Sequence, residues 1–528
     1  MNVAEIDYSA EPASIILPER YNAAVEFVDV HIPAGRGDKA AFIDDQASYS
    51  YAELTERVNR AGNALLSLGL PSESRVLLCL QDTIDFPAAF FGAMKAGLVP
   101  VPLNTLMTTD DYAYILSDSR ARALIVSDDL YEKWDPIISG SPHLNQVVIS
   151  RGHRHGKANL SDLLDAASHD LAPAATSPDD VAFWLYTSGS TGRPKGAMHM
   201  HRDLIYTAVH YGRGVLGIRE DDLVFSAAKM FFAYGLGNTL TFPLFAGATA
   251  VVHAGRPTPD SVLSVLQHHK PTIFFGVPTL YAAMVAAEIA PGDGAERLRL
   301  AVSAGEALPQ DVGNRWQSAF NTEIIDGLGS TEMLHIFLSN RPGHARYGTT
   351  GKAIPGYDLR LLDEAGNDVG TGEIGELTVR GGSAAIAYWN QREKSLRTFQ
   401  GPWTRTGDQY TVDADGYYTY AGRNDDMLKV SGIWVSPFEV ESALIEHDAV
   451  LEVGVVGAPD ADQLIKPKAF VVTAAGTPGD DKLTMALQDY VKSRLAPHKY
   501  PRWIEYVEEL PKTATGKVQR YKLRSRDS

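Results

Sequence analysis

The spacing of apolar residues along the first 350 positions alternates between a helical period and short unbroken runs. Ser50 and Glu53 have the spacing of a capping box, and the apolar positions after them repeat every three or four residues until Gly69. Apolar runs and helical patterns then succeed one another at 75–80, 86–96, 98–103, 112–117, 123–127, 273–277, 300–303 and 322–325. Strands that alternate with helices in this way predict parallel sheets joined by crossover helices.

The pattern changes near residue 357. Runs at 358–362, 375–379 and 417–420 alternate apolar and polar residues, and turn sequences such as 364–367 separate them. This alternation predicts a small antiparallel, β-barrel-like subdomain over about 357–422. We therefore expect an α/β fold in which a large N-terminal domain of parallel-rich α/β sheets, residues 1–424, includes that subdomain.

The last hundred residues have a pattern of their own. Ser436, Pro437 and Glu439 form a second capping-box sequence, with proline at the first helical position. After it we expect a helix to about 447, strands at 450–456 and 468–473, a helix over 481–494 and a strand near 503–507. This order predicts a small, mobile C-terminal α+β domain, residues 425–528.

Composition narrows the classes of protein and partner. The 528 residues include 48 Lys and Arg against 65 Asp and Glu, and the formal charge of −17 argues against nucleic-acid partners and anionic membranes. No apolar run of about 18 residues and no leader pattern is present, so neither a membrane span nor a signal peptide is expected. The one cysteine, Cys79, lies in an apolar run and is expected in the core. A cytoplasmic location is expected by elimination.

Residues 187–196, with the sequence TSGSTGRPKG, hold the clearest candidate chemistry. Glycines let backbone N–H groups approach phosphate oxygens, hydroxyls add donors, and Arg193 and Lys195 add positive charge. Because an apolar run, 181–186, precedes this segment, we expect a mobile loop that closes over a polyphosphate. The Walker A pattern does not fit here, and a flexible glycine–serine linker is the alternative.

Five further segments share a resemblance with that loop. They are SAGEA at 303–307, DGLGSTE at 326–332, TRTGD at 404–408, GRNDD at 422–426 and PKTATGK at 511–517. In order and spacing, the six segments resemble the motifs of the adenylate-forming enzymes, which include acyl-CoA synthetases, peptide-synthetase adenylation domains and luciferases. The resemblance extends from about residue 30 to 524. It implies that the protein joins ATP and a carboxylic acid to an acyl-adenylate.

The resemblance also implies which residues bind ATP. The phosphates would be bound by Lys195 together with Thr187, Ser188, Gly189, Ser190, Thr191 and Gly192. Glu332 would hold Mg²⁺, which prefers carboxylate oxygen, and Thr331 would bond the α-phosphate. A helix-start carboxylate is the alternative for Glu332. Ribose, phosphate and adenine would be bound by Asp408, Arg423, Gly305, Glu306, Asp326 and Leu328, with aliphatic contact at Leu328 where the family often has an aromatic ring.

The C-terminal motif would complete the reaction. By resemblance, Lys517 bridges the substrate carboxylate and the α-phosphate, with Glu332 and Lys195 as the other catalytic residues; an ordinary surface lysine is the alternative. Rotation of the C-terminal domain about Asp425 would then exchange Lys517 for a thiol, with Gly432 beside the pantetheine channel of coenzyme A. Acetylation removes the charge of a lysine, which makes Lys517 a candidate for control by a protein acetyltransferase.

Segment 231–237, FFAYGLG, would form one wall of the acid pocket. The pocket candidates are Ala233, Tyr234, Gly327, His335 and Ile336, with ordinary core packing as the alternative. No basic residue within 231–237 can pair with a second carboxylate, and His335 could donate a hydrogen bond to a ring hydroxyl. The chain as a whole most resembles bacterial benzoate–CoA ligases. Benzoate and close analogues, such as 2-aminobenzoate and small fluorobenzoates, are therefore the expected acids.

Three alternatives stay open at this point. The enzyme could activate another small acid, load an aryl acid onto a carrier-protein thiol, or bind the nucleotide as a sensor without catalysis. The presence of Lys195, Glu332 and Lys517 together disfavours the sensor. The expected partners are ATP, Mg²⁺, coenzyme A and an aryl carboxylate. Neither nucleic acid nor a membrane is expected, and a homodimer is compatible with the resemblance.

Overall fold

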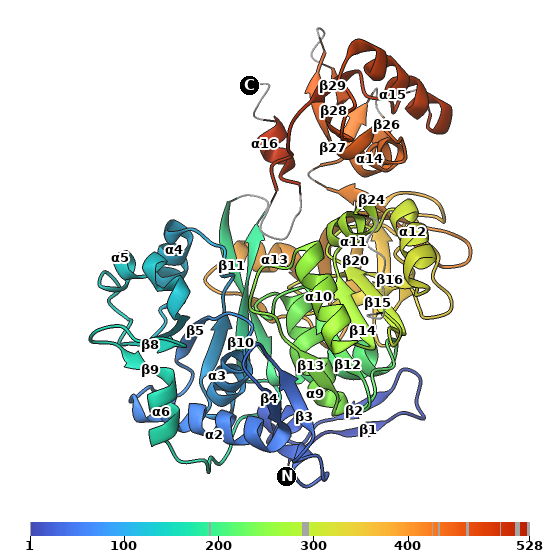
Figure 1. Ribbon diagram of the computed structural model, residues 1–528. Coiled ribbons are helices and arrows are strands. Elements are labelled where there is room, and N and C mark those ends of the chain that lie inside the picture. Colours follow the sequence, from blue (N-terminus) through green and yellow to red (C-terminus); the bar gives the residue numbers. More distant parts are fainter. Residues whose placement is uncertain are drawn as a thin grey trace.

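A large body and a smaller C-terminal lobe that stands on it make up the computed structural model (Figure 1). The structure describes residues 2–189, 192–287, 295–424, 426–430, 433–460, 464–496, 498–512 and 518–524, and only the backbone of 188, 189, 192, 429, 433, 434 and 521. Five predicted site residues lie outside the described residues: Ser190, Thr191, Asp425, Gly432 and Lys517. The mixed α/β architecture, with a separate small C-terminal domain, confirms the expected fold class.

One sheet of the body is parallel throughout and has the strand order β6-β5-β7-β8-β9. Its strands are β5 (Arg75–Cys79), β6 (Val99–Pro102), β7 (Ala123–Ser127), β8 (Gln146–Ser150) and β9 (Ala158–Asn159). Its helices are α2 (Tyr51–Ser67), α3 (Asp85–Lys95), α4 (Thr109–Ser119), η2 (Asp128–Lys133), α5 (Asp135–Ile138) and α6 (Leu160–Ala166). Ser50 and Glu53 form the expected capping box of α2, and Cys79 is buried in the core, as predicted.

A nine-stranded sheet, in the order β18-β17-β16-β15-β14-β12-β13-β3-β4, forms the other half of the body. Its strands are β3 (Ala40–Ile43), β4 (Ser48–Ser50), β12 (Leu223–Ser226), β13 (Thr249–Val251), β14 (Ile273–Gly276), β15 (Leu300–Ala304), β16 (Ile324–Gly329), β17 (Ile336–Ser339) and β18 (Lys352–Ala353). The six strands from β16 to β3 are parallel, and antiparallel strands flank them. The parallel core agrees with the strand–helix alternation of the sequence.

Helices of this half cover the nine-stranded sheet, and short elements precede it in the chain (Figure 1). The helices are α7 (His201–Thr207), η3 (Ala208–Arg213), α8 (Ala233–Gly235), η4 (Leu236–Thr241), α9 (Phe242–Ala246), α10 (Pro259–His269), α11 (Pro278–Ala286) and α12 (Gln310–Phe320). The N-terminal elements are β1 (Glu5–Asp7), β2 (Ser14–Ile16), α1 (Ala23–Phe27) and η1 (Asp29–His31). In the described part of the chain, no helix combines the length and apolar character that crossing a bilayer requires.

The segment expected as a loop at 187–196 is mostly a β-hairpin, which corrects that prediction. Strands β10 (Val181–Gly189) and β11 (Gly192–Met200) pair in antiparallel register, with Thr187 opposite Lys195, and β21 (Ala387–Tyr388) adds a third strand. Backbone pairing continues from the apolar run into the polar residues because glycine and hydroxyl side chains do not prevent the extended conformation. Of the residues predicted here to bind phosphate, 187–189 therefore lie on β10, and Gly192 and Lys195 lie on β11.

The antiparallel subdomain follows the expected alternation. It contains β19 (Asp358–Leu362), β20 (Gly375–Arg380), β22 (Phe399–Gln400), β23 (Trp403–Val412), β24 (Tyr418–Arg423) and α13 (Arg392–Thr398). Its strand order is β19-β20-β23-β22, and β24 also pairs with β23. The turn at 364–367 is present, because the N–H of Asp363 bonds the carbonyl of Asn367 across it.

The C-terminal lobe packs two helices against a small sheet (Figure 1). Its elements are β25 (Leu428–Val430), β26 (Ile433–Val435), α14 (Pro437–Ile445), β27 (Val450–Pro459), β28 (Ile465–Thr473), α15 (Asp481–Arg494), β29 (Trp503–Tyr506) and α16 (Arg520–Arg524). Ser436 caps α14 by accepting from the N–H of Glu439, as predicted. The return bond of a capping box is replaced by an ion pair, because the Glu439 carboxylate lies 2.6 Å from Lys499 Nζ.

Candidate functional site

Two of the predicted motifs meet at the carboxyl ends of β15 and β16. These neighbouring parallel strands pair Ser303 with Asp326 and Ala304 with Gly327. Gly305, directly after β15, has φ +98°, a left-handed conformation that glycine adopts without strain. Gly305 and Glu306, which follow β15, therefore lie next to residues 326–328 of β16. Loops at the carboxyl ends of parallel strands are where open α/β sheets usually bind ligands.

Lys195 and Glu332 come together although 137 positions separate them in the chain. The Lys195 ammonium lies 4.0 Å from a carboxylate oxygen of Glu332, and both side chains are mostly buried. Burial lowers the pKa of Lys195, and the charge of Glu332 opposes that shift. A cation and a carboxylate held this way can bind a phosphate chain and a divalent metal side by side.

Tyr388 on β21 fixes both members of that pair. Its hydroxyl donates a 2.5 Å hydrogen bond to Glu332, and its ring centre lies 4.2 Å from the Lys195 ammonium. Burial and the neighbouring Glu332 charge raise the pKa of Tyr388, so its hydroxyl remains protonated and donates. Because Tyr388 pairs with Ala197 on β11, the hairpin and the tyrosine form one unit.

A buried histidine holds the backbone next to Glu332. His199 Nε2 donates to the carbonyl of Thr331 at 2.8 Å, while Nδ1 contacts the Asp203 carboxylate at 2.9 Å. All atoms of the His199 and Asp203 side chains are buried. Burial raises the pKa of Asp203, and its contact with His199 opposes that shift. Asp203 and His199 thus orient the segment that carries the candidate α-phosphate and metal residues.

Asp408 and Arg423 face each other across β23 and β24. They are register partners, and Arg423 Nη1 lies 3.0 Å from Asp408 Oδ1. The same guanidinium nitrogen donates to the carbonyl of Thr406 at 3.2 Å. Asp408 is buried and Arg423 is partly exposed. The pair provides an acceptor and a donor at one place, as the binding of ribose hydroxyls and a phosphate requires.

Asp326 is the most perturbed carboxyl group of the site. Burial raises its pKa to about 8, so the group is uncharged at pH 7. Its Oδ1 has no hydrogen-bond partner within the described residues. A neutral buried acid with an unused oxygen is suited to a ligand that carries both hydrogen-bond donors and acceptors, as adenine does.

The pocket candidates occupy one region, built from α8, β16 and β17. His335 Nε2 lies 3.1 Å from the carbonyl of Tyr234, whose hydroxyl donates to the carbonyl of Val302 at 3.1 Å. A Cβ at Gly327 would approach Ile336 Cγ2 to 2.8 Å, so a side chain there would displace Ile336. Ala233, directly before Tyr234, is partly buried against the same core.

The expected role of His335 as a hydrogen-bond donor to the acid is wrong in this arrangement. A carbonyl only accepts, so the contact with Tyr234 places the imidazole proton on Nε2. Burial lowers the pKa of His335 to about 3, which keeps the ring neutral, and Nδ1 is therefore an acceptor. That Nδ1 atom has no partner in the part of the chain that the structure describes.

Three residues of this region were not found from the sequence. Tyr388, His199 and Asp203 lie in none of the six motifs, and Tyr388 and His199 contact partners that are distant in the chain. The spacing of His199 and Asp203, four residues apart across a strand-to-helix junction, is the one local signal for their contact. Nothing near Tyr388 in the sequence indicates Glu332, because β21 reaches it only by pairing with β11.

The donors near Lys195 fit a magnesium ion that is bound together with phosphates. Among the described residues, no three or more His, Cys, Asp and Glu side chains gather to hold a metal by themselves. Mg²⁺ is commonly held by one or two carboxylates, with substrate phosphates and water completing its shell. Glu332, oriented by Tyr388 and beside a phosphate-binding cation, is a donor of this kind.

Comparison with known families decides the classification. Residues 31–389 match the family described as AMP-binding enzyme, and residues 439–517 match the AMP-binding enzyme C-terminal domain. The chain belongs to the AMP-binding enzyme family. The resemblance to adenylate-forming enzymes that the six motifs indicated is thereby confirmed.

Individual relatives of this family are similar over nearly their full lengths. Benzoate–CoA ligase of Thauera aromatica is 57% identical over 521 residues, which cover 98% of this chain and 98% of that protein. The structure of a benzoate CoA ligase from Burkholderia xenovorans LB400 superposes with a TM-score of 0.88 at 50% identity, over 96% of this chain and 100% of that one. The anthranilate CoA ligase AuaEII, solved in complex with anthranoyl-AMP, gives a TM-score of 0.92 at 44% identity, over 97% and 98%.

Proposed function

We propose that the protein is an AMP-forming ligase that joins benzoate, or a close analogue, to coenzyme A. The observation that carries the proposal is the buried contact of Lys195, Glu332 and Tyr388 at the edge where the nucleotide motifs meet. It occurs in a chain 57% identical to a benzoate–CoA ligase over 98% of both lengths. A family member solved with an aryl-adenylate supports the same chemistry.

The first half-reaction forms a mixed anhydride. A carboxylate oxygen of the acid attacks the α-phosphorus of ATP, the bond from that phosphorus to the bridging oxygen breaks, and pyrophosphate leaves. Lys195 would bind the β- and γ-phosphates, and Asp408 with Arg423 would hold the ribose. Because a carboxylate is a weak nucleophile, the enzyme acts mainly by positioning the two anions and offsetting their charge.

Magnesium would be held by Glu332 together with phosphate oxygens. When bound, it supplies positive charge to the phosphate chain. Tyr388 fixes the Glu332 carboxylate by its 2.5 Å hydrogen bond, and His199 fixes the Thr331 carbonyl beside it. These contacts fix the oxygen atoms of Glu332 and Thr331 before ligands bind. The side chain and backbone therefore need not rearrange when the ligands arrive, which lowers the free-energy cost of reorganisation.

The second half-reaction transfers the acyl group to sulfur. The thiolate of coenzyme A attacks the carbonyl carbon, the bond to the AMP oxygen breaks, and AMP leaves. We propose that Lys517 serves the first step and that the C-terminal domain rotates about Asp425 for the second, with Gly432 beside the entering pantetheine. These three residues lie outside the described residues, and their roles are predictions.

The pocket around Tyr234 and His335 is suited to a flat, apolar ring. Both side chains are close to other aromatic rings: His335 lies 4.5 Å from Phe242 and 5.6 Å from Tyr234, measured between ring centres. Within the described residues, His335 Nδ1 is one of the acceptors without a partner here, so a ring amino or hydroxyl group would donate to it. One substituent changes the binding free energy by only ~1–3 kcal/mol. We therefore expect the enzyme to accept benzoate and its substituted relatives with different efficiencies and not to exclude any of them completely.

A panel of aryl and alkyl carboxylic acids tests the proposal. AMP formation is measured with ATP, Mg²⁺ and each acid, with and without free coenzyme A. Benzoate-like acids should give AMP turnover that depends on coenzyme A, together with the aroyl thioester. Turnover that requires a carrier protein instead would support the carrier-loading alternative. Binding of ATP without any pyrophosphate release would support a sensor.

A further inference from the structure

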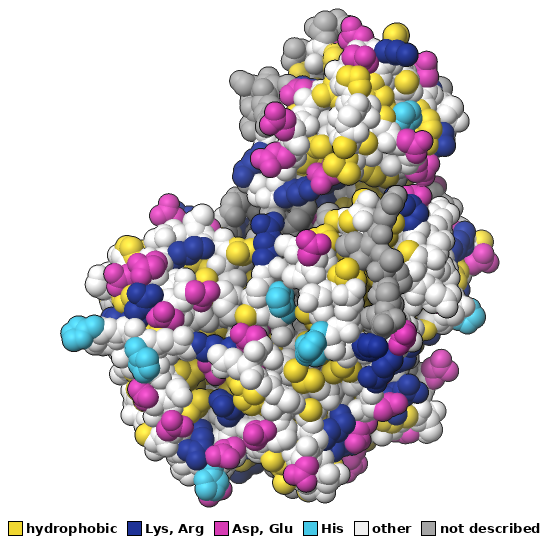
Figure 2. Space-filling model, viewed as in Figure 1, with side chains coloured by type: hydrophobic (Ala, Val, Ile, Leu, Met, Phe, Trp, Pro, Cys, Tyr) yellow, Lys and Arg dark blue, Asp and Glu magenta, His cyan; other side chains and the backbone are white. Residues whose placement is uncertain are grey.

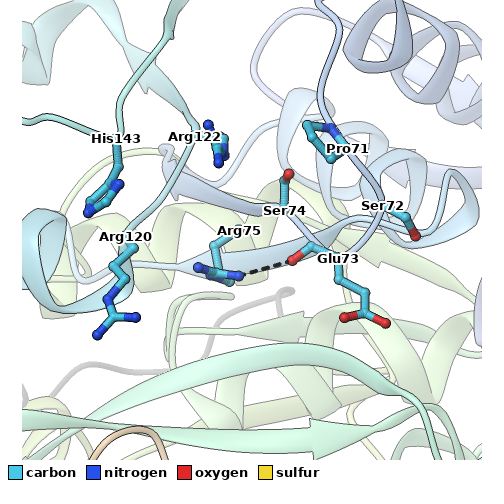
Figure 3. Close-up of a pocket in the computed structure, with 8 residues that line it drawn as sticks. All are labelled: Pro71, Ser72, Glu73, Ser74, Arg75, Arg120, Arg122 and His143. Carbon is cyan, nitrogen blue, oxygen red and sulfur yellow. Dashed lines mark hydrogen bonds between the residues drawn. The ribbon is translucent and has the colours of Figure 1, made fainter.

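A recess of about 290 Å³ lies outside the site described above (Figure 3). Its polar lining consists of Ser72, Glu73, Ser74, Arg75, Arg120, Arg122 and His143. It is formed at the amino ends of parallel strands, whereas the nucleotide motifs meet at the carboxyl ends of strands in the other sheet. Neither the motifs nor the proposed ligase reaction uses any of these seven residues.

The sheet itself brings the basic residues together. Arg75 is the first residue of β5, and Arg122 directly precedes β7, the neighbouring parallel strand. The N–H of Arg122 bonds the carbonyl of Arg75 at 3.0 Å. His143 lies in the segment that leads into β8, where the N–H of Asn145 bonds the carbonyl of Arg122 at 2.8 Å. Three consecutive strands of the sheet thus start around one opening.

The guanidinium group of Arg75 is held in place by a backbone carbonyl and two tryptophan rings. Its Nε donates to the carbonyl of Ser119 at 2.9 Å, and its guanidinium carbon lies 5.6 Å from the Trp184 ring centre and 5.4 Å from that of Trp389. Arg120 lies over the same Trp389 ring at 5.6 Å. Arginines fixed in this way lose little conformational entropy when they bind a ligand.

Two acidic side chains, Glu73 and Asp118, lie near this cluster, but neither forms an ion pair with its arginines. Arg75, Arg120 and Arg122 form no ion pair within 4 Å with any carboxylate in the described part of the chain. In Figure 3 the Glu73 carboxylate points away from the three guanidinium groups. The carboxylate of Asp118, close in sequence, accepts a 2.6 Å hydrogen bond from Tyr186. Burial, and then the charges of Arg120 and Arg122, lower the pKa of Arg75.

Elsewhere many arginines have a carboxylate partner. On the face shown in Figure 2, acidic and basic side chains are interspersed. Arg154, Arg360 and Arg380 each pair with a carboxylate at less than 3 Å. In a chain with a formal charge of −17, three adjacent arginines without acidic partners are an exception. Their mutual repulsion is relieved when a bound anion supplies the missing charge.

We propose that the recess binds the phosphoryl group of a small anion. Guanidinium groups present parallel donors that match phosphate oxygens, and the Ser74 hydroxyl adds a donor from the same wall. The volume is near the lower limit of pockets that bind small molecules, and a phosphate or a compact phosphate monoester fits that size. The chemistry is shared by free phosphate and by the 3′-phosphate of coenzyme A.

The test is a calorimetric titration of the full chain without ATP or acid. Two probes are used separately: inorganic phosphate, and adenosine 3′,5′-bisphosphate, which is the nucleotide end of coenzyme A. We expect Arg120→Gln and Arg122→Gln each to weaken binding about tenfold, which corresponds to ~1.4 kcal/mol, and the double variant to abolish it. Both residues are exposed, so the variants should fold, and thermal unfolding checks that they do.

Two matched variants control the experiment. Arg397→Gln removes one positive charge from an exposed, distant arginine and should leave binding unchanged. Lys195→Gln alters the nucleotide site, which is itself proposed to bind phosphates, and it should leave unchanged the part of the binding that Arg120→Gln and Arg122→Gln weaken. Binding of inorganic phosphate identifies a site for the free anion, and binding of the bisphosphate alone, in competition with coenzyme A, identifies the nucleotide end of that substrate.

The proposal is overturned by no binding of either probe up to ~10 mM, or by binding that Lys195→Gln removes and the double arginine variant keeps. Since the titration needs no catalysis, it is independent of the ligase proposal. A protein that binds phosphate in the recess but forms no AMP would refute the ligase function and leave this site standing.

Discussion

At the scale of single residues, burial decides what each group of the site can do. Asp326 and Glu332 are both carboxyl groups within one seven-residue motif. Burial raises the pKa of Asp326 to about 8, whereas Glu332 has a tyrosine donor and a neighbouring cation. The first group is therefore neutral at pH 7, and the second accepts a hydrogen bond beside the Lys195 ammonium. Two carboxyl groups of one motif thus serve different ligand chemistry.

Asp326→Asn should leave adenylation at pH 7 within about threefold of the wild type, since the amide resembles the uncharged acid in size and charge. The wild-type group is neutral below about pH 8 and becomes charged above it, where it would repel anionic ATP. The KM for ATP should therefore rise through pH 8 in the wild type and stay flat in Asp326→Asn. A loss of more than about 100-fold at pH 7 would show that the anion is required.

The sequence predicts the identities of the site residues better than it predicts their contacts. The motifs named Lys195, Glu332, Asp408 and Arg423 by resemblance, and the structure places each pair in contact. Tyr388 and His199 could not be found, because their partners depend on strand pairing and on a loop 132 residues away. The sequence also could not predict which ring nitrogen of His335 carries the proton, because this depends on the contact with the backbone carbonyl of Tyr234.

At the scale of elements, the short strand β21 connects the hairpin of β10 and β11 to the carboxylate of Glu332. It pairs with β11 through Ala387 and Tyr388, and Tyr388 then bonds Glu332. The following residue, Trp389, packs on Trp184 of β10, with 4.8 Å between ring centres. The geometry of Lys195 and Glu332 therefore depends on an element of two residues.

Tyr388→Phe keeps the ring beneath Lys195 and removes only the hydroxyl bonded to Glu332. We expect the Mg²⁺ concentration for half-maximal adenylation to rise about 10-fold, the size expected for one hydrogen bond to a charged group. Adenylation rates measured over a magnesium series check this. Tyr186→Phe is the matched control, because it removes a comparable bond to Asp118. An equal effect in both variants would exclude a specific role for Tyr388.

Elements with local signals were predicted well, whereas the strand pairing at 187–196 was not. The helix expected at 481–494 is α15, and the capping box at Ser50 begins α2 as expected. Both signals lie within a few residues of the element that they define. The hairpin of β10 and β11 was expected as a loop, because the glycines and hydroxyls that suit phosphate binding also resemble a turn. The Glu439 side chain does not make the return bond of the expected capping box, because it pairs with Lys499, which is 60 residues away in the chain.

At the scale of the whole molecule, the junction of body and lobe has contacts on both sides of residue 425. The N–H of Asn424 bonds the carbonyl of Gly407, and the Asp426 carboxylate pairs with Arg520 at 3.3 Å and with Arg524. Tyr420 of β24 meets Phe438 of α14 with 5.3 Å between ring centres. The side chain of Asp426 is thus bonded within the lobe, while its N–H and that of Met427 both bond the carbonyl of Arg423 in the body at 3.0 Å. A hinge at Asp425 stays a prediction, and rotation would have to break or carry these contacts.

Asp425→Pro should impair thioester formation more than adenylation, by about 10-fold or more, because proline fixes φ and a hinge must change it. The two half-reactions are measured separately, by pyrophosphate exchange and by conversion of supplied benzoyl-AMP with coenzyme A. Asp425→Ala is the control, since alanine keeps the backbone free, and it should affect both steps little. Equal impairment of both steps by proline would remove the hinge from this account.

The most direct measurement of the central claim is a single turnover with the enzyme in excess over labelled benzoate. With ATP and Mg²⁺ but no coenzyme A, rapid quenching should reveal enzyme-bound benzoyl-AMP in an amount equal to the pyrophosphate released. Coenzyme A added afterwards should convert that intermediate to benzoyl-CoA and AMP. Formation of the thioester without any adenylate, under these conditions or with any other acid of the panel, would contradict the account.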